Sequence, residues 1–302
     1  MEYVRIPTRP HIRIVLKTIT VAHSPDADDI FMYYAIKFGW ISMAGISFEN
    51  QALDIETLNL EALKNSYDIT AISFALYPKI KDEYALLRTA VSFGEGYGPK
   101  LVKRQGTQLK RNFKVALSGT HTTNALLFKI AYPQARIVYK NFLEIEEAVL
   151  SKEVDAGVLI HESILTYHES LVVERELWDI WKQLCKKELP LPLGGMALRR
   201  SMPLMRAIAC EKMLIQAVDV AHTHQTLLSK MLLERSLVRV DQSTLKTYLG
   251  LYANAHSIQM NDIQYEAIDT LFELGYEHGF YEQRIHPQDY LIPCEYEALR
   301  NS

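Results

Sequence analysis

A histidine placed for proton transfer ends an apolar run of the sequence. Residues 158–160 are valine, leucine and isoleucine, and His161 follows them directly. A strand buried in a sheet gains nothing from ending on an ionisable residue, so this pattern indicates a side chain that leaves the sheet toward a ligand. An imidazole with an ordinary pKa of about 6.5 accepts protons at neutral pH, and a positioned general base is worth roughly 10²- to 10⁴-fold in rate. We therefore select His161 as the candidate base.

Purely structural roles for the residues of this junction also stay open. His161 could be a hydrogen-bonded structural residue, which is common for a histidine at a strand end. Glu162 could orient the imidazole, but a glutamate is also stabilised by the dipole of a helix that begins there. We favour that second role for Glu162.

Polar residues follow three other strand-like runs in the same way. The runs are "TITVAH", "YDITAI" and "FKVAL", and a helix-like pattern begins close behind each of them. In open α/β sheets, ligands bind beyond the carboxyl ends of the strands. We therefore expect one binding site that His161 shares with Ser24, Asp29, Ser73, Thr122 and Thr123.

The stretch "ALSGTHTTNALLF" predicts a site for an anion. The chain turns at Gly119 into a helix whose first turn carries the hydroxyls of Thr120, Thr122 and Thr123. Free backbone N–H groups at a helix start bind carboxylate or phosphate. One threonine would be enough to cap the helix. The additional hydroxyls favour a binding site for a carboxylate or phosphate group over a simple cap.

The sequence favours neither a metal site nor a disulfide framework. Asp26, Asp28 and Asp29 lack the glycine turn and the distal glutamate of a calcium loop, and a helix start favours negative charge without any cation. The histidines of "HTH" (222–224) would point apart on a helix. The three cysteines lie far apart without a Cys-x-x-Cys pair, which indicates free thiols in a reducing compartment. We expect no metal and no cofactor.

Composition excludes other classes of partner. The 302 residues carry a formal net charge of −3 and are 48% hydrophobic, so nothing pulls the protein toward nucleic acid or an anionic membrane. The sequence has no run near the roughly 18 apolar residues of a membrane span. Residues 1–17 contain two prolines and lack the apolar centre of a signal peptide. We expect a cytoplasmic protein with a small ligand, and the sequence leaves the oligomeric state open.

The elements that must position these residues follow an α/β rhythm. Strand-like "TITVAH", "ISFENQ" and "YDITAIS" alternate with helical patterns, and Asp54 is placed to cap the helix "IETLNLEALKN". The alternation restarts at "FKVAL" and runs to "DAGVLI". It predicts largely parallel sheets. Residues 203–283 are expected to form successive helices, with Gly250 and Gly275 as stops.

Two such blocks predict two lobes with a central cleft. The glycine-rich stretches "FGEGYGPKLVKR" and "LPLPLGGMALRR" join the blocks, and "GPKLVKR" and "GGMALRR" are the predicted hinge strands. The carboxyl ends of both strand sets would face the cleft. We assign residues 18–99 and 191–302 to a discontinuous first lobe with a helical C-terminal part, residues 100–190 to the second lobe, and residues 1–17 to an N-terminal arm.

From about Thr18 to the C-terminal helices, the chain resembles the menaquinone-biosynthesis enzymes of the futalosine pathway, in particular the 1,4-dihydroxy-6-naphthoate synthase branch. The motifs that carry the resemblance are Ser24-Pro25 with Asp29 and Phe31, "DIETLN", Ser73, "GEGYGP", "HTT" at 121–123, "IHES" followed by Thr166-Tyr167, and "LPLGGMALRR".

The resemblance implies a periplasmic-binding-protein type II fold that works as an intracellular enzyme. The implied reaction is that of a lyase, which converts cyclic dehypoxanthine futalosine to 1,4-dihydroxy-6-naphthoate and releases a small sugar-derived fragment without metal or organic cofactor. The resemblance further implies that His161 accepts a proton. Ser73, Thr122 and Thr123 would hold the substrate and its carboxylate.

The chain departs from the family pattern at two places. The usual "SPCPNDTF" is "SPDADDIF" here, with changes at Asp26, Ala27, Asp28 and Ile30, and the usual arginine after "IHES" is Ile164. The first change makes the edge of the cleft more acidic, and the second removes a cation that could steady an acidic substrate. Two alternatives remain: a non-catalytic solute-binding protein of the same fold, which is normally exported, and the related chorismate dehydratase.

Overall fold

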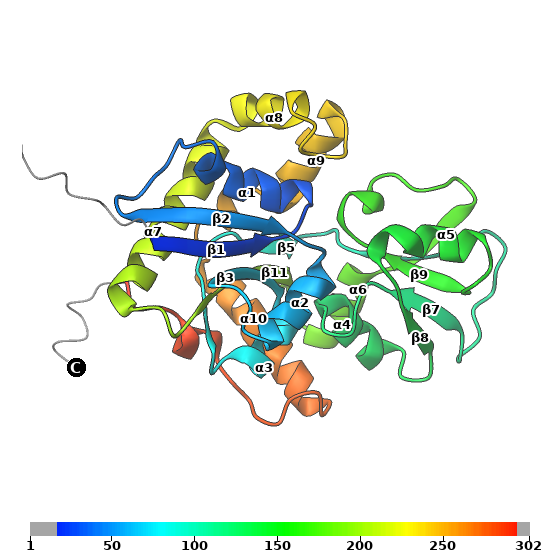
Figure 1. Cartoon of the computed structure of the whole chain (residues 1–302). Helices are drawn as coiled ribbons and strands as arrows, with labels where there is room; N and C mark the ends of the chain where they lie inside the picture. Colours follow the sequence, from blue (N-terminus) through cyan, green and yellow to red (C-terminus); the bar gives the residue numbers. More distant parts are fainter. Residues whose placement is uncertain (1–16, 295–302) are drawn as a thin grey trace, which may run out of the picture.

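Two separate sheets, each covered by helices, form two lobes that lie side by side (Figure 1). The computed structural model describes residues 17–294. The expected N-terminal arm therefore lies outside the described residues, except for Lys17, which begins the first strand. The expected two-lobe α/β architecture is confirmed.

The first sheet combines parallel and antiparallel pairing in the order β2-β1-β3-β11-β4, with β5 paired to β11. β1 runs parallel to β2 and β3, whereas β11 runs antiparallel to β3, β4 and β5. All five residues of the central strand β3 are buried, as expected for a strand covered on both faces. The strands are β1 (Lys17–His23), β2 (Ile46–Ala52), β3 (Ile69–Ser73), β4 (Tyr84–Leu86), β5 (Ser92–Gly94) and β11 (Leu191–Arg199).

The second sheet repeats this plan in the order β10-β6-β9-β7-β8. β7 is parallel to β8 and β9, while β6 is antiparallel to β9 and β10. The prediction of largely parallel sheets thus holds only for the βαβ units, because the strands that follow the crossings between lobes enter each sheet from the opposite end. The strands are β6 (Lys100–Arg104), β7 (Lys114–Leu117), β8 (Arg136–Tyr139), β9 (Ala156–Leu159) and β10 (Leu171–Glu176).

Helices cover the faces of both sheets, and α2 begins at the cap that the sequence suggests. The side chain of Asp54 accepts the N–H of Thr57 at the start of α2, at 3.2 Å, which confirms the predicted cap. The helices are α1 (Ala27–Lys37), α2 (Ile55–Leu63), α3 (Tyr77–Ile80), α4 (Thr123–Ala131), α5 (Ile145–Leu150), α6 (Leu177–Cys185), α7 (Leu204–Thr223), α8 (Gln225–Glu234), α9 (Gln242–Tyr252) and α10 (Asp262–Glu277).

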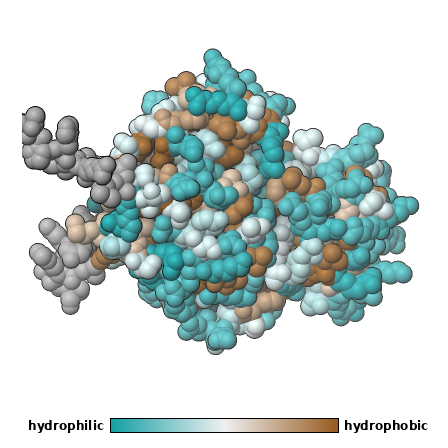
Figure 2. Space-filling model, in the orientation of Figure 1, coloured by the Kyte–Doolittle hydropathy of each residue, from teal (hydrophilic) through white to brown (hydrophobic). Residues whose placement is uncertain are grey.

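The C-terminal helices pack on the first lobe, as predicted. α7, α8 and α9 contact α1, and α10 lies against β11 and also against α6 (Figure 1). A buried ion pair between Arg88 Nη1 and Glu211 Oε2, at 2.7 Å, attaches α7 to the loop after β4. On the face shown in Figure 2, hydrophilic residues spread over both lobes and hydrophobic residues are scattered among them. Each described helix is too short or too polar to cross a lipid bilayer.

The chain crosses between the lobes twice, and the crossings run side by side. The first crossing joins β5 to β6 and the second joins α6 to β11. They meet where Gly94 pairs with Leu191. The predicted hinge strands lie directly after these crossings, in β6 and β11. We propose the crossings as the lobe boundaries, at 99/100 and 190/191.

The two glycines that were expected to end helices lie inside them. α9 continues past Gly250 to Tyr252, and α10 continues past Gly275 to Glu277. At Gly275 the reason is a close approach, since an added Cβ would lie 2.0 Å from the Tyr281 ring. The Tyr281 hydroxyl donates to the Ala75 carbonyl at 2.7 Å, which fixes the ring there. An added Cβ at Gly250 would meet open space.

Replacing each of these glycines by alanine should have opposite effects on stability. Gly275→Ala is expected to lower the free energy of unfolding by about 1–3 kcal/mol, because the new methyl group displaces the Tyr281 ring. Gly250→Ala is expected to raise it by roughly 0.5–1 kcal/mol, because alanine loses less backbone entropy in a helix. Guanidinium chloride unfolding followed by circular dichroism measures both variants. The same sign of change in both would contradict this explanation.

Candidate active site

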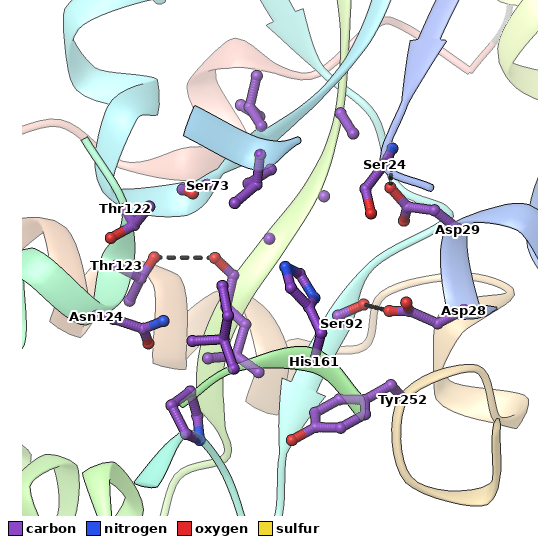
Figure 3. Close-up of a pocket in the computed structure, with 18 of the residues that line it drawn as sticks. Ser24, Asp28, Asp29, Ser73, Ser92, Thr122, Thr123, Asn124, His161 and Tyr252 are labelled. Carbon is purple, nitrogen blue, oxygen red and sulfur yellow. Dashed lines mark hydrogen bonds between the residues drawn. The ribbon is translucent and has the colours of Figure 1, made fainter. Parts of the chain in front are cut away.

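A cavity lies between the two lobes, where the ends of both sheets face each other (Figure 3). The volume of the cavity is about 100 Å³. All of the residues selected from the sequence line it, namely Ser24, Asp29, Ser73, Thr122, Thr123 and His161. Asp28, which the sequence marked as part of an acidic cleft edge, also lines it, together with four polar residues that the sequence did not single out, Ser92, Asn124, Tyr248 and Tyr252.

The strand ends bring these residues together. Ser73 is the last residue of β3, and Ser24 follows the last residue of β1. In the other lobe, α4 begins shortly after β7 ends, and His161 stands two residues beyond the end of β9. Carboxyl strand ends of both sheets therefore supply the cavity, as the α/β rhythm predicts.

His161 has an unusual backbone conformation and a ring that points into the cavity (Figure 3). Its φ angle is 55°, in the left-handed region that costs energy for a residue with a Cβ. The Nδ1 atom lies 2.9 Å from Asp26 Oδ2. The Phe142 ring packs edge-on against the imidazole, with the ring centres 4.9 Å apart. Nε2 is buried without a hydrogen-bond partner, and so it is the free nitrogen of the ring.

The surroundings make the imidazole strongly basic. Burial alone would lower the pKa of His161, but the charge of Asp26 and its hydrogen bond outweigh burial. Asp28 and Glu162 add to the effect, and the pKa is raised to about 9. The ligand-free ring is therefore mostly protonated at pH 7, and it is a strong base once it has lost its proton.

Asp26 has a different role from the one expected. It stands at the N-cap position of α1, yet its side chain makes no capping bond. The side chain is only 1% exposed, and its Oδ1 accepts from Arg239 Nη2 at 2.7 Å while the Ser24 hydroxyl donates to Oδ2. Burial would raise the pKa of Asp26, but the charge and hydrogen bond of His161, with Ser24 and Arg239, hold it below its ordinary value.

Arg239 could not have been found by local sequence reasoning. It lies between α8 and α9, about eighty residues beyond His161 in the sequence, in a stretch without any motif. Its guanidinium group lies 3.8 Å from Glu162 Oε2 and 5.3 Å from the centre of the Phe142 ring. A cation is therefore present at this edge of the cleft, although Ile164 replaces the arginine of the family pattern.

Glu162 does lie in the first turn of a short 3₁₀ helix (His161–Ile164), as favoured from the sequence. Its carboxylate, however, reaches the other lobe, where Oε1 accepts the Ala27 N–H at 3.0 Å. The group that contacts the imidazole is Asp26, not Glu162.

The two remaining carboxyl groups of the β1–α1 junction have raised pKa values. Burial and the neighbouring Asp28 raise the pKa of Asp29 well above its ordinary value. Burial and Asp26 raise the pKa of Asp28 to about 6, and Asp28 Oδ2 accepts from the Ser92 hydroxyl at 2.9 Å. Asp29 Oδ2 accepts the Ser24 N–H at 2.8 Å, so both carboxyl groups are held by donors of their own lobe.

The threonine hydroxyls at the start of α4 are engaged within the protein. Thr122 Oγ1 caps the helix by accepting the Ala125 N–H at 3.2 Å. Thr123 Oγ1 donates to the Leu193 carbonyl at 2.9 Å (Figure 3). Both hydroxyls are thus engaged within the protein while both residues line the cavity, and their contact with a substrate stays a prediction. The donors left for an anion are first-turn N–H groups of α4 and the hydroxyl of Ser73, whose oxygen accepts from Asn59.

A carboxylate of the protein occupies the turn that precedes α4. Glu56 of α2 accepts the N–H of Thr120 at 2.8 Å with Oε1 and the N–H of His121 at 3.1 Å with Oε2. Burial raises the pKa of Glu56, and these two hydrogen bonds act against the rise. The turn does bind a carboxylate, but the carboxylate is that of Glu56, and the contact joins the first lobe to the second. Among the described residues, no cluster of three or more His, Cys, Asp or Glu side chains could hold a metal ion.

Comparison with known proteins agrees with the sequence motifs. The profile of a family described as "Menaquinone biosynthesis" matches residues 19–277. The chain belongs to this menaquinone-biosynthesis family. It is similar to the 1,4-dihydroxy-6-naphthoate synthase of Thermus thermophilus, with 30% identity over 85% of this chain and 93% of that relative. The enzyme of the same name from Streptomyces coelicolor is 28% identical over 84% and 91% of the two chains.

Solved structures place the family fold among binding proteins. A protein of Archaeoglobus fulgidus superimposes with a TM-score of 0.79 and 33% identity, over 89% of this chain and all of that one. The alkanesulfonate-binding protein of Xanthomonas axonopodis has a TM-score of 0.63 at 11% identity, over 91% of this chain and 97% of that chain. The predicted periplasmic-binding-protein fold is confirmed.

Removing the Glu56 carboxylate should weaken the contact between the lobes. Glu56→Ala takes away the acceptor of two N–H groups, each worth about 1 kcal/mol. The ratio of molecules with the lobes in contact to molecules with the lobes apart should fall by roughly 5- to 30-fold. Small-angle X-ray scattering of the ligand-free variant should show a larger radius of gyration than the wild type. The matched control is Glu61→Ala on the same helix, because Glu61 bonds only Lys64 and Ser66 of its own lobe. Equal radii for Glu56→Ala and wild type would contradict this role.

Proposed function

We propose that this protein is the lyase that converts cyclic dehypoxanthine futalosine to 1,4-dihydroxy-6-naphthoate, with His161 as the general base. The observation that carries the proposal concerns the two nitrogens of the His161 ring at the cavity. Asp26 holds Nδ1, whereas Nε2 is buried without a hydrogen-bond partner. Membership of the menaquinone-biosynthesis family and the names of the two synthases support the reaction.

The hydrogen bond to Asp26 sets which nitrogen of His161 reacts. A carboxylate accepts from Nδ1–H, so the neutral ring carries its lone pair on Nε2. Nε2 takes a proton from the substrate, and the electron pair left behind on the substrate drives the cleavage that releases the small sugar-derived fragment. Asp26 then stabilises the imidazolium that forms.

The charges in the cavity favour one orientation of an acidic substrate. Ser73 and the first-turn N–H groups of α4 offer donors on one side, which suits the carboxylate. Asp28 and Ser92 lie near His161 on the other side, where an ionised carboxylate would be repelled. The carboxyl oxygens of Asp28 and Asp29 suit sugar hydroxyls instead.

Product analysis tests the proposal directly. The purified protein is mixed with cyclic dehypoxanthine futalosine and, separately, with chorismate, and the products are identified by mass spectrometry. Formation of 1,4-dihydroxy-6-naphthoate supports the proposal. Dehydration of chorismate would instead assign the related dehydratase reaction. Binding without any product would assign a non-catalytic binding protein.

His161→Asn should remove turnover but not binding. Asparagine keeps a polar side chain of similar reach and cannot take up a proton at neutral pH, so kcat should fall by about 10²- to 10⁴-fold. The dissociation constant of the substrate, measured by isothermal titration calorimetry, should change little. Product formation at the wild-type rate would refute the role of base.

The activity should rise with pH. The raised pKa of His161 means that the base form is scarce at neutral pH, so kcat/KM of the wild type should increase about tenfold per pH unit and level off near pH 9. The measurement is initial rates at low substrate concentration between pH 6 and about 10. A fall in kcat/KM over this range would show that the protonated ring is the active form.

A further inference from the structure

The imidazole of His161 is anchored from the lobe opposite to its own. His161 follows β9 of the second sheet, whereas Asp26 follows β1 of the first. Asp26 Oδ2 lies 2.9 Å from Nδ1 of the ring. Phe142 supports the ring from its own lobe, edge-on, with 4.9 Å between the ring centres. The ring is therefore held between an aromatic side chain of one lobe and a carboxylate of the other.

Asp26 itself is fixed before it meets the ring. Its oxygens accept from the Ser24 hydroxyl and from Arg239 Nη2, and its side chain is 1% exposed. A buried carboxylate with a donor on each oxygen has one orientation, and charge-assisted bonds of this kind are the stronger ones. Since Asp26 makes no capping bond to α1, the helix start does not account for this arrangement.

We propose that Asp26 is a positioning residue for His161, which acts across the cleft and holds the base in its working orientation only while the lobes are in contact. The part of this proposal that concerns turnover rests on the proposed function. Arg239 and Glu162 support the same contact, because Arg239 bonds Asp26 and approaches Glu162, and Glu162 accepts the Ala27 N–H across the cleft.

Several other charged or titratable groups surround the imidazole. Asp28 and Asp29 lie on α1, Tyr248 lies on α9, Glu162 belongs to the same turn as the ring, and Arg239 lies before α9. Asp26 is the only one of these groups in hydrogen-bond contact with the ring among the described residues. Its removal should therefore change the ring more than the removal of any other.

The titration of His161 tests the contact without any substrate. In protein with isotope-labelled histidine, NMR follows each of the ten histidine rings, and the signal that is lost in His161→Asn identifies His161. In Asp26→Asn the midpoint of His161 should fall from the wild-type value by at least about one pH unit, because the nearest negative charge is gone. Asp26→Cys carries the residue of the family pattern and should lower the midpoint in the same direction.

The chain offers a matched control on its surface. Asp269 Oδ1 lies 2.7 Å from His286 Nδ1, in a pair that is far more exposed than the one in the cavity. Asp269→Asn removes the same carboxylate from an aspartate–histidine contact outside the cavity. The His161 midpoint should stay at its wild-type value in this variant.

The kinetics separate a positioning role from a merely structural one. In Asp26→Asn, the rise of kcat/KM should move to lower pH together with the NMR midpoint, and the plateau should fall by roughly 10- to 100-fold because the base is misplaced. A residue that only supports the fold would lower the activity equally at every pH and leave the position of the rise unchanged.

An unchanged His161 midpoint in both Asp26→Asn and Asp26→Cys would overturn the proposal, whatever the activity. So would a rise of kcat/KM that keeps its wild-type position in a folded variant. A shifted midpoint in a protein whose wild type forms no naphthoate product would keep the contact and refute the proposed function instead. The two failures are thus distinguishable.

Discussion

The contact between Asp26 and His161 is the interaction on which the site depends. Asp26 is buried and the His161 side chain is only 18% exposed, and a charge removed from water in this way is stable only with a partner of opposite sign. Because the two residues come from different lobes, each lobe supplies half of a pair that neither could bury alone. The same contact lowers the pKa of Asp26, raises that of His161 and leaves Nε2 as the free nitrogen. The basicity of His161, its tautomer and the contact between the lobes therefore all depend on this one hydrogen bond.

The other polar groups divide the cavity into two electrostatic sides. Carboxyl groups of the β1–α1 junction gather near His161, and burial together with their mutual repulsion raises the pKa of Asp29 well above its ordinary value. The α4 side offers backbone donors, which the helix dipole reinforces. Glu56 accepts the N–H groups of Thr120 and His121 in the turn before α4 and so joins the lobes. N–H groups in the first turn of α4 itself remain for a ligand. In the proposed function, charge as well as hydrogen bonding would direct an acidic ligand toward Ser73 and α4.

Features that depend on local sequence could be predicted, and features set by tertiary contacts could not. Alternating apolar runs predicted the parallel βαβ units, and the Asp54 cap follows from an aspartate directly before a helix-like run. The strand-end rule placed His161 and Ser73 at one cavity. The prediction that Gly275 ends a helix was wrong, because the glycine is needed for the close approach of the Tyr281 ring, which only the three-dimensional structure reveals. The departure of "SPDADDIF" from the family pattern did mark Asp26, but its partners, His161 and Arg239, lie more than a hundred residues away.

The basicity of His161 sets two effects against each other. A higher pKa makes the neutral ring a better proton acceptor but leaves fewer neutral rings, and about two pH units below the pKa only about one ring in a hundred is neutral. The position of Asp26 on the opposite lobe makes this balance depend on the contact between the lobes in the proposed mechanism. With the lobes in contact, as in the ligand-free structure, the protonated ring predominates at pH 7, whereas separation of the lobes would remove the carboxylate partner and return the pKa of His161 toward its ordinary value. Closure would then bring Asp26 to Nδ1 and raise the affinity of Nε2 for a proton when the substrate is the nearest donor.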